Sequence, residues 1–112
     1  MNSPGPREDT NPIDLAVTTS PTDLWVQVRG EVDLSNSHRL QAALAAVDFD
    51  DADVVNLDLR QLTFCDTDGC RVLLLFEREV RLSGHQARIH GATSTVRKVL
   101  GFISDGDQPT FA

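Results

Sequence analysis

Apolar residues recur at every second position in two short stretches near the start of the chain, residues 13–17 and 24–29. This period is typical of strands that bury one face. A cluster of turn-forming residues at 20–23 separates the two stretches. Two such strands joined by a short turn predict an antiparallel hairpin.

The rest of the chain alternates between helical spacing and short apolar runs. The spacing predicts helices over residues 38–47, 72–84 and 94–100, the last stopped by Gly101, and strands over 54–59 and 87–91, with Phe102 and Ile103 starting a last short strand. A strand-helix-strand order implies right-handed parallel crossovers. The predicted fold class is therefore α/β: a small mixed β-sheet, with an antiparallel N-terminal hairpin and parallel βαβ crossovers, flanked by helices.

The second predicted helix has a clear amphipathic pattern. Val72, Leu73, Phe76 and Val80 form one apolar stripe, widened by Leu75. Its charged residues cover the other side, and we expect them to face solvent: Arg71, Glu77, Arg78, Glu79 and Arg81. Gly84 follows as a C-terminal cap.

The length and composition bound the domain count and the class of partner. The chain has 112 residues, of which 40% are hydrophobic, and this suits one domain. We expect a disordered leader at residues 1–12, a domain at 13–104, and a short C-terminal tail or edge strand at 105–112. The net charge of −7 makes nucleic acid an unlikely partner class. No run approaches the roughly 20 apolar residues of a membrane helix, and no secretory signal is visible, so we expect a cytoplasmic protein.

The turn Phe64–Cys70 joins the buried strand to the second helix and is the main candidate site. Ligands and partners of α/β folds meet the chain at the carboxyl ends of strands. Asp66 and Thr67 are both suitable helix N-caps, and Asp68 adds a carboxylate near the positive end of the helix dipole. The simpler interpretation is a well-capped helix without further function.

The candidate chemistry at this turn is limited. Cys65 and Cys70 fit small buried residues, with redox sensing as the alternative. The segment Asp66-Thr67-Asp68-Gly69 has the Asp-x-Asp-Gly spacing of haloacid-dehalogenase-like phosphatases, in which the first Asp is a nucleophile. That family needs further motifs downstream, and Lys98 is the only lysine in the chain. We therefore expect no enzyme, no cofactor and no metal site, and the acidic connector 48–53 reads as a solvated loop.

Four segments together resemble a known family. Gly30–Asp33 resembles the Gly-Glu-Leu-Asp signature of STAS domains, the bacterial anti-sigma factor antagonists. Leu57–Cys70 is similar to their central strand and the Asp-Ser-Ser-Gly turn after it. Ser83–Ala87 resembles the loop before the next strand, and Val96–Phe102 resembles the final helix. The resemblance spans residues 13–104.

The resemblance implies a function. Such domains bind an anti-sigma factor, an ATP-dependent serine/threonine kinase of the histidine-kinase-like fold, and so release a sigma factor. The kinase phosphorylates the hydroxyl residue after the motif Asp, here Thr67, and a serine/threonine phosphatase reverses this. The family usually has Ser at Thr67 and a second hydroxyl residue at Asp68, so a STAS scaffold that is never phosphorylated is the alternative. The expected partner-contacting residues are Asp33, Ser35, Asp66, Thr67, Asp68 and Arg71.

Overall fold

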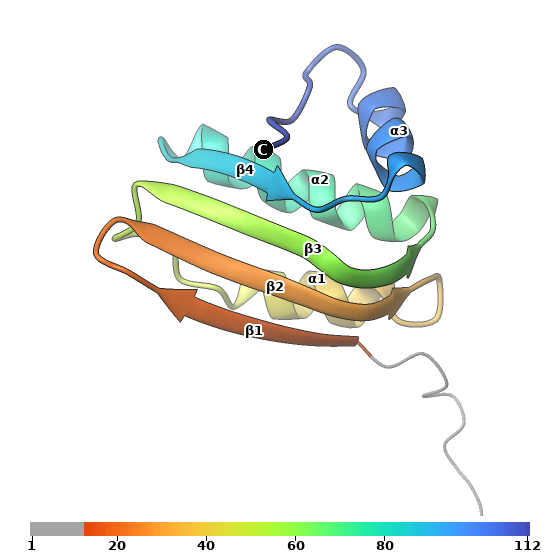
Figure 1. Ribbon diagram of the computed structural model, residues 1–112, viewed down its shortest axis with the longest axis horizontal. Coiled ribbons are helices and arrows are strands. Elements are labelled where there is room, and N and C mark those ends of the chain that lie inside the picture. Colours follow the sequence, from red (N-terminus) through yellow and green to blue (C-terminus); the bar gives the residue numbers. More distant parts are fainter. Residues whose placement is uncertain (1–12) are drawn as a thin grey trace, which may run out of the picture.

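Within residues 13–112, four strands form one mixed sheet in the order β1-β2-β3-β4 (Figure 1). The computed structural model describes residues 13–112, so the predicted leader at 1–12 lies outside the described residues. The strands are β1 (Ile13–Thr19), β2 (Asp23–Val32), β3 (Val54–Cys65) and β4 (Gln86–His90). β1 pairs antiparallel with β2, whereas β2, β3 and β4 are parallel. The mixed sheet with an N-terminal hairpin is confirmed.

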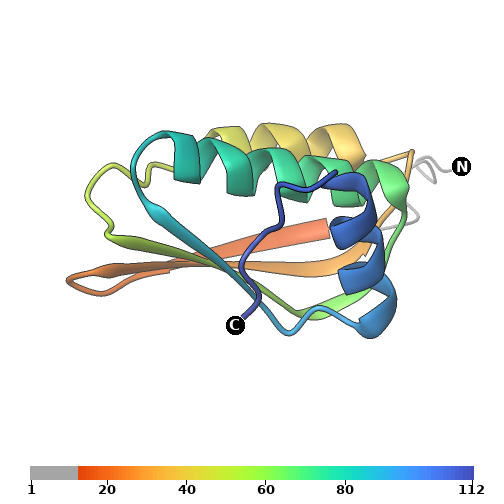
Figure 2. The ribbon, with the colours of Figure 1, turned by 90° about the horizontal axis from the view of Figure 1, so that it is seen from above.

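The described part of the chain also contains three helices: α1 (Ser37–Ala45), α2 (Thr67–Leu82) and α3 (Ser94–Ile103). α1 and α2 lie side by side on the same face of the sheet, and α3 packs beside α2 near the end of the molecule where α2 begins (Figures 1 and 2). No helix within residues 13–112 is long and apolar enough to cross a membrane. The order of strands and helices therefore agrees with the predicted α/β class.

The hydrophobic core lies between the sheet and the two covering helices. The apolar residues of β2 that alternate along the strand, Leu24, Val26 and Val28, are all buried, and β3 contributes Leu57 and Leu59 in the same way. Because side chains of a strand alternate between its faces, their neighbours point to the uncovered face of the sheet. These neighbours are mainly polar or amphipathic. The two-residue period of the sequence therefore makes one face of the sheet apolar and the other mainly polar.

The covered flank of α2 differs from the predicted one. Leu75 was expected to widen the apolar stripe, but it is 57% exposed, whereas Leu74 is buried. Glu77 was expected in solvent, but it is buried and accepts a 2.6 Å hydrogen bond from Arg81 Nε. Arg81 also bonds Asp107 of the C-terminal tail. Both errors have one cause, because α3 and the tail cover this flank of the helix.

The C-terminal part of the chain also departs from the prediction. Helix α3 does not stop at Gly101 but continues to Ile103, and the Ser104 N–H donates to the Leu100 carbonyl at 3.1 Å. Phe102 and Ile103 are therefore helical and do not start a strand. The tail then returns to β4, where Phe111 forms a single parallel bridge with Ile89. Glycine alone is a weak stop signal when it does not adopt a positive φ.

Candidate partner-binding site

The carboxyl ends of β2 and β3 are joined at the start of α2. Val32 and Cys65, the last residues of the two strands, are register partners. The backbone N–H of Asp66 then donates to the Val32 carbonyl at 3.0 Å. Asp33 and Asp66, the first residues after the strands, therefore lie at the same edge of the sheet. Their proximity follows from the parallel pairing of β2 and β3, because the carboxyl ends of parallel neighbours meet at one edge of the sheet.

Asp66 caps helix α2. Its backbone is extended, and its Oδ1 accepts a 2.9 Å hydrogen bond from the Gly69 N–H. Thr67, the first residue of the helix, is consequently free of the capping role and is exposed to solvent. Of the two predicted N-caps, Asp66 takes the position. Thr67 therefore lies on the surface between two residues whose backbone N–H groups are hydrogen-bonded, Asp66 before it and Gly69 after it.

Asp68 and Arg71 follow on the first turn of α2. The Arg71 side chain is exposed and that of Asp68 is about half exposed, and Asp68 Oδ1 lies 3.9 Å from Arg71 Nη1. An exposed pair at this distance contributes little to stability. The pair matters for the local charge, because the carboxylates of Asp66 and Asp68 and the cation of Arg71 lie near Thr67.

Gly69 allows α2 to start in contact with the sheet. A Cβ at this position would lie 2.6 Å from Cys65 Sγ and 2.6 Å from Val32 Cγ1. Both atoms belong to buried side chains, so neither has room to withdraw. The glycine of the turn is therefore required by close helix–strand packing, and it sets how near Thr67 lies to the strand ends.

The loop after β2 is held by an internal set of hydrogen bonds. Asp33 Oδ1 accepts from both the backbone N–H and the hydroxyl of Ser35. The buried Asn36 accepts from the Asp33 N–H and donates to the Glu31 carbonyl at 2.8 Å. Asn36 occupies the N-cap position of α1 but makes no side-chain cap to it. Sequence reasoning missed this bracing role, because residue type does not reveal which backbone groups a side chain meets.

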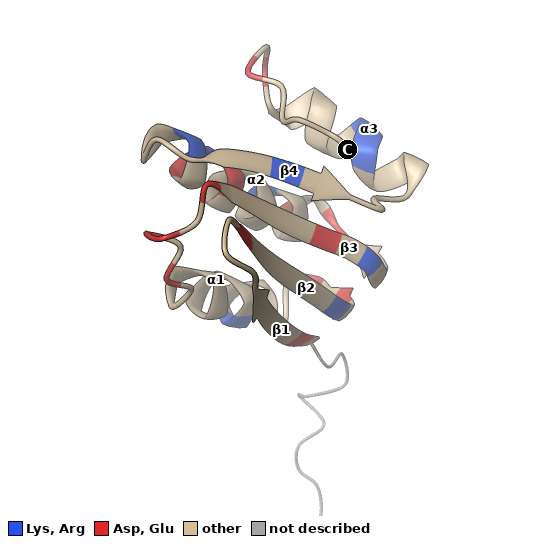
Figure 3. Cartoon of the chain, turned by 60° about the vertical axis from the view of Figure 1, so that its left-hand side comes forward, with Lys and Arg blue, Asp and Glu red and all other residues tan. Residues whose placement is uncertain are grey.

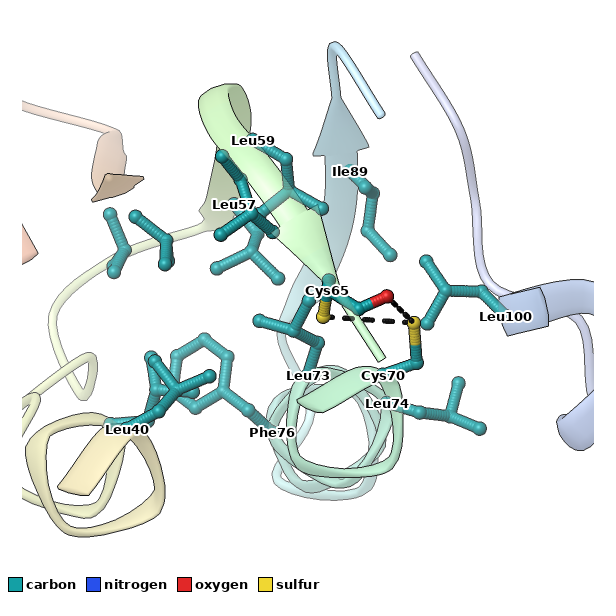
Figure 4. Packing of buried hydrophobic residues seen from close by; sticks show 14 of the residues in the cluster. Leu40, Leu57, Leu59, Cys65, Cys70, Leu73, Leu74, Phe76, Ile89 and Leu100 are labelled. Atoms are coloured by element: carbon teal, nitrogen blue, oxygen red, sulfur yellow. Dashed lines mark hydrogen bonds between the residues drawn. The ribbon is translucent and has the colours of Figure 1, made fainter. Parts of the chain in front are cut away.

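Cys65 and Cys70 lie behind the turn, in the core (Figure 4). Their sulfurs are 3.7 Å apart, well beyond a disulfide bond. The hydrogen bond with Cys70, together with burial, raises the pKa of the Cys65 thiol. A protonated and buried thiol is a poor nucleophile. The geometry favours the interpretation of both residues as small core residues, and the redox role remains an untested alternative.

A groove runs from Thr67 toward α3. It has a volume of about 460 Å³, and its lining residues are Thr67, Arg71, Lys98, Val99, Phe102 and Ile103. Sequence reasoning selected the two residues from α2 but none from α3, because the sequence does not show that α3 packs beside the start of α2. No group of three or more metal-ligating side chains converges anywhere in residues 13–112.

The comparison with protein families fits this fold and this turn. The family model described as "Mlab, STAS domain" matches residues 15–104. The chain therefore belongs to the STAS domain family, as the resemblance of its motifs indicated. No curated protein matches the chain.

Several solved structures are similar to this chain. The anti-sigma factor antagonist SpoIIAA in its unphosphorylated form has 19% identity and a TM-score of 0.66, with 90% of this chain and 87% of that chain covered. An anti-sigma factor antagonist from Mycobacterium paratuberculosis has 21% identity and a TM-score of 0.66, with 89% and 86% covered. The murine Slc26a9 anion transporter has 16% identity and a TM-score of 0.64, with 80% of this chain but 15% of that chain covered. At these identities the likeness shows the fold alone.

Proposed function

We propose that this protein is an anti-sigma factor antagonist whose switch residue is Thr67. In its unphosphorylated form it binds an anti-sigma factor of the kinase type and so releases a sigma factor. The anti-sigma factor phosphorylates Thr67, and a serine/threonine phosphatase restores the hydroxyl. The protein acts in the cytoplasm and catalyses no reaction itself.

The observation that carries this proposal is the exposed position of Thr67 directly after the capping Asp66. An exposed hydroxyl at a rigid turn can enter a kinase cleft without unfolding the domain. A phosphate would add about −1.5 to −2 charges at pH 7. The start of α2 tolerates this charge within the domain, whereas an apolar or acidic partner surface does not. Two similar structures bear the name anti-sigma factor antagonist, and that supports the same role here.

The second candidate is a STAS scaffold that binds its partner without regulation by phosphate. Asp68 favours it, because this half-exposed carboxylate is a permanent negative charge one residue from Thr67. In this case the carboxylate disfavours a phosphate on Thr67 by like-charge repulsion, and the hydroxyl stays unmodified. The partner would then respond neither to ATP nor to a change at Thr67.

Incubation with the kinase-type anti-sigma factors of the source organism, with ATP and Mg²⁺, distinguishes the two candidates. We expect one phosphate per chain, mapped to Thr67 by mass spectrometry and abolished by Thr67→Ala. Thr95→Ala is the matched control, since Thr95 is also exposed and lies in the first turn of α3. Binding of a kinase without any phosphate on Thr67 would reject the switch and support the scaffold. Binding of none of these kinases would reject the role of antagonist.

A further inference from the structure

The groove between α2 and α3 is framed by two pairs of residues, each one helical turn apart. Thr67 and Arg71 stand at i and i+4 on α2, and Lys98 and Phe102 stand at i and i+4 on α3. Residues at this spacing lie on the same side of a helix, about 6 Å apart. Each helix therefore contributes one cation to the groove, beside a hydroxyl on α2 and beside a large apolar side chain on α3.

The apolar part of the groove contains an aromatic side chain that is almost fully exposed. Phe102 is 86% exposed, and the half-buried Val99 and Ile103 of the same helix extend its surface into the groove. Beneath them, Val96 and Leu100 anchor α3 in the core. Phe102 is thus held on a well-packed helix but covered by nothing within the described residues. Exposed aromatic residues on a rigid support are typical anchors of protein interfaces.

The charge of the groove is opposite to that of the molecule. The chain carries a net charge of −7, yet α3 contains Arg97 and Lys98 and no acidic residue (Figure 3). Within residues 13–112 Lys98 forms no ion pair, and Arg71 has only its long contact with Asp68. Both cations are therefore available to a partner. An acidic segment would be attracted here and repelled by much of the remaining surface.

We propose that this groove binds an acidic amphipathic helix of the partner protein. One or two apolar side chains of that helix pack on Phe102, Val99 and Ile103, and carboxylates beside them pair with Arg71 and Lys98. Apolar anchors and carboxylates one turn apart on a helix match the one-turn spacing of the groove residues. The inference rests on the proposed function for the partner's identity, but the groove itself is defined independently of any phosphorylation.

The groove also explains how a phosphate on Thr67 would act on binding. Thr67 lines the same groove as Arg71 and Lys98, so the phosphate would compete with the partner's carboxylates for these two cations. Its own charge would repel the acidic helix as well. The phosphate would therefore oppose partner binding by competing for the same two cations, and the fold of the domain would not have to change.

Titration of the full-length ¹⁵N-labelled protein with synthetic peptides tests the groove directly. The probes are an 18-residue amphipathic helix of Leu and Glu, the same pattern with Lys in place of Glu, and a scrambled Leu/Glu peptide. We expect the acidic helix alone to shift the amide signals of residues 67–71 and 98–103, and its affinity to fall about tenfold in Phe102→Ala. Lys98→Glu should lower the affinity for the acidic helix by a similar factor, and by more at low salt.

Two matched variants control for general effects on the surface. Leu82 is also 86% exposed but lies at the far end of α2, so Leu82→Ala should change the affinity less than twofold. Arg88 is an exposed cation on β4, and Arg88→Glu should be similarly neutral. Equal binding of the acidic and basic peptides, shifts outside the groove, or no shift at millimolar peptide would overturn the inference.

The two proposals fail in different ways. A kinase that phosphorylates Thr67 but binds Phe102→Ala as tightly as the native chain leaves the proposed function intact and rejects the groove. An acidic peptide that binds the groove with the expected dependence on Phe102 and Lys98, while no kinase binds the protein, supports the groove and rejects the function of antagonist.

Discussion

The N–H of Asp66 donates to the carbonyl of Val32 at 3.0 Å, and this bond joins two strand ends that are more than 30 residues apart in the chain. It extends the ladder between β2 and β3 by one residue beyond Cys65. Asp66 then turns into α2 and caps it. Because the same residue closes the sheet and starts the helix, the hydroxyl of Thr67 has a defined position relative to both. A protein partner can therefore bind the turn without first having to order it.

Removal of the fixed charge beside Thr67 should favour its phosphorylation. In Asp68→Asn the like-charge repulsion between the carboxylate and the phosphate disappears. At a separation of about 6 Å in water, a phosphate of about −1.5 to −2 charges corresponds to an effect of roughly six- to tenfold before screening by salt. We expect the equilibrium phosphorylation of Thr67 and the affinity of the unmodified chain for its partner both to rise. Quantitative mass spectrometry and calorimetry measure the two. Asp50→Asn, in the exposed acidic connector, should change neither.

The two helical glycines should respond in opposite directions to a methyl group. Gly69→Ala places its Cβ against Cys65 Sγ and Val32 Cγ1, and such overpacking costs about 1–3 kcal/mol of unfolding free energy. Gly101→Ala meets only the Gln108 side-chain oxygen at 3.3 Å and should gain up to about 1 kcal/mol from helix propensity. Urea denaturation measures both. An unchanged stability of Gly69→Ala would contradict the close packing.

The cap of α2 gives a stability prediction and also tests the phosphatase alternative. Asp66→Ala should lose about 1 kcal/mol of unfolding free energy, because the Gly69 N–H loses its acceptor, while Asp66→Asn should retain most of it. Thr93→Ala removes the equivalent cap of α3 and should have a similar cost.

We expect neither the native chain nor Asp66→Asn to hydrolyse a generic phosphate ester in the presence of Mg²⁺. If the native chain hydrolysed the ester and Asp66→Asn did not, Asp66 would be established as a nucleophile. The assignment of this turn to partner binding would then be rejected.

Both thiols should be inert in the native protein. Cys65 and Cys70 are buried, and the hydrogen bond with Cys70, burial and the nearby Asp66 carboxylate raise the pKa of Cys65. Reaction with a colorimetric disulfide reagent should be about 100-fold slower than in urea, since it requires local unfolding. Partner affinity should be the same with and without reductant. Fast labelling of the folded chain would revive the redox alternative.

The stability should fall in acid through a carboxylate on the uncovered face of the sheet. The guanidinium of Arg60 donates two hydrogen bonds to the buried Asp58, and its backbone N–H donates a third. These bonds hold the pKa of that carboxyl below its ordinary value. The contribution is therefore complete above about pH 5 and is lost as the pH falls through the lowered pKa. Since Arg60 is largely exposed, we expect about 1 kcal/mol between the native chain and Asp58→Asn at pH 7.

Urea denaturation from pH 3 to pH 7 checks this difference. The free energy that separates the native chain from Asp58→Asn should shrink toward the acidic end, and a gap that stays constant across the range would contradict the role of the Arg60 pair.

The features that were predictable from the chain are those that depend on near neighbours. The alternation of Leu24, Val26 and Val28 requires a strand with one buried face, whatever lies against it. The capping of α2 by Asp66 needs only a short side chain and the N–H three residues later. The parallel order of β2 and β3 follows from the helix between them, and it places Asp33 and Asp66 at one edge.

The features that were missed depend on elements that are distant in the chain. Leu74 rather than Leu75 is buried because α3 lies on that flank of α2, and Glu77 is buried beside Arg81 because the tail lies over it. Gly69 is necessary only because two strands approach its Cα.

Phe102 lies in the groove because α3 continues through Gly101 and packs beside α2. Periodicity along a sequence states that a side chain has a buried or an exposed face. It does not state which element covers that face, because burial is a property of the contacts that form only when the chain folds.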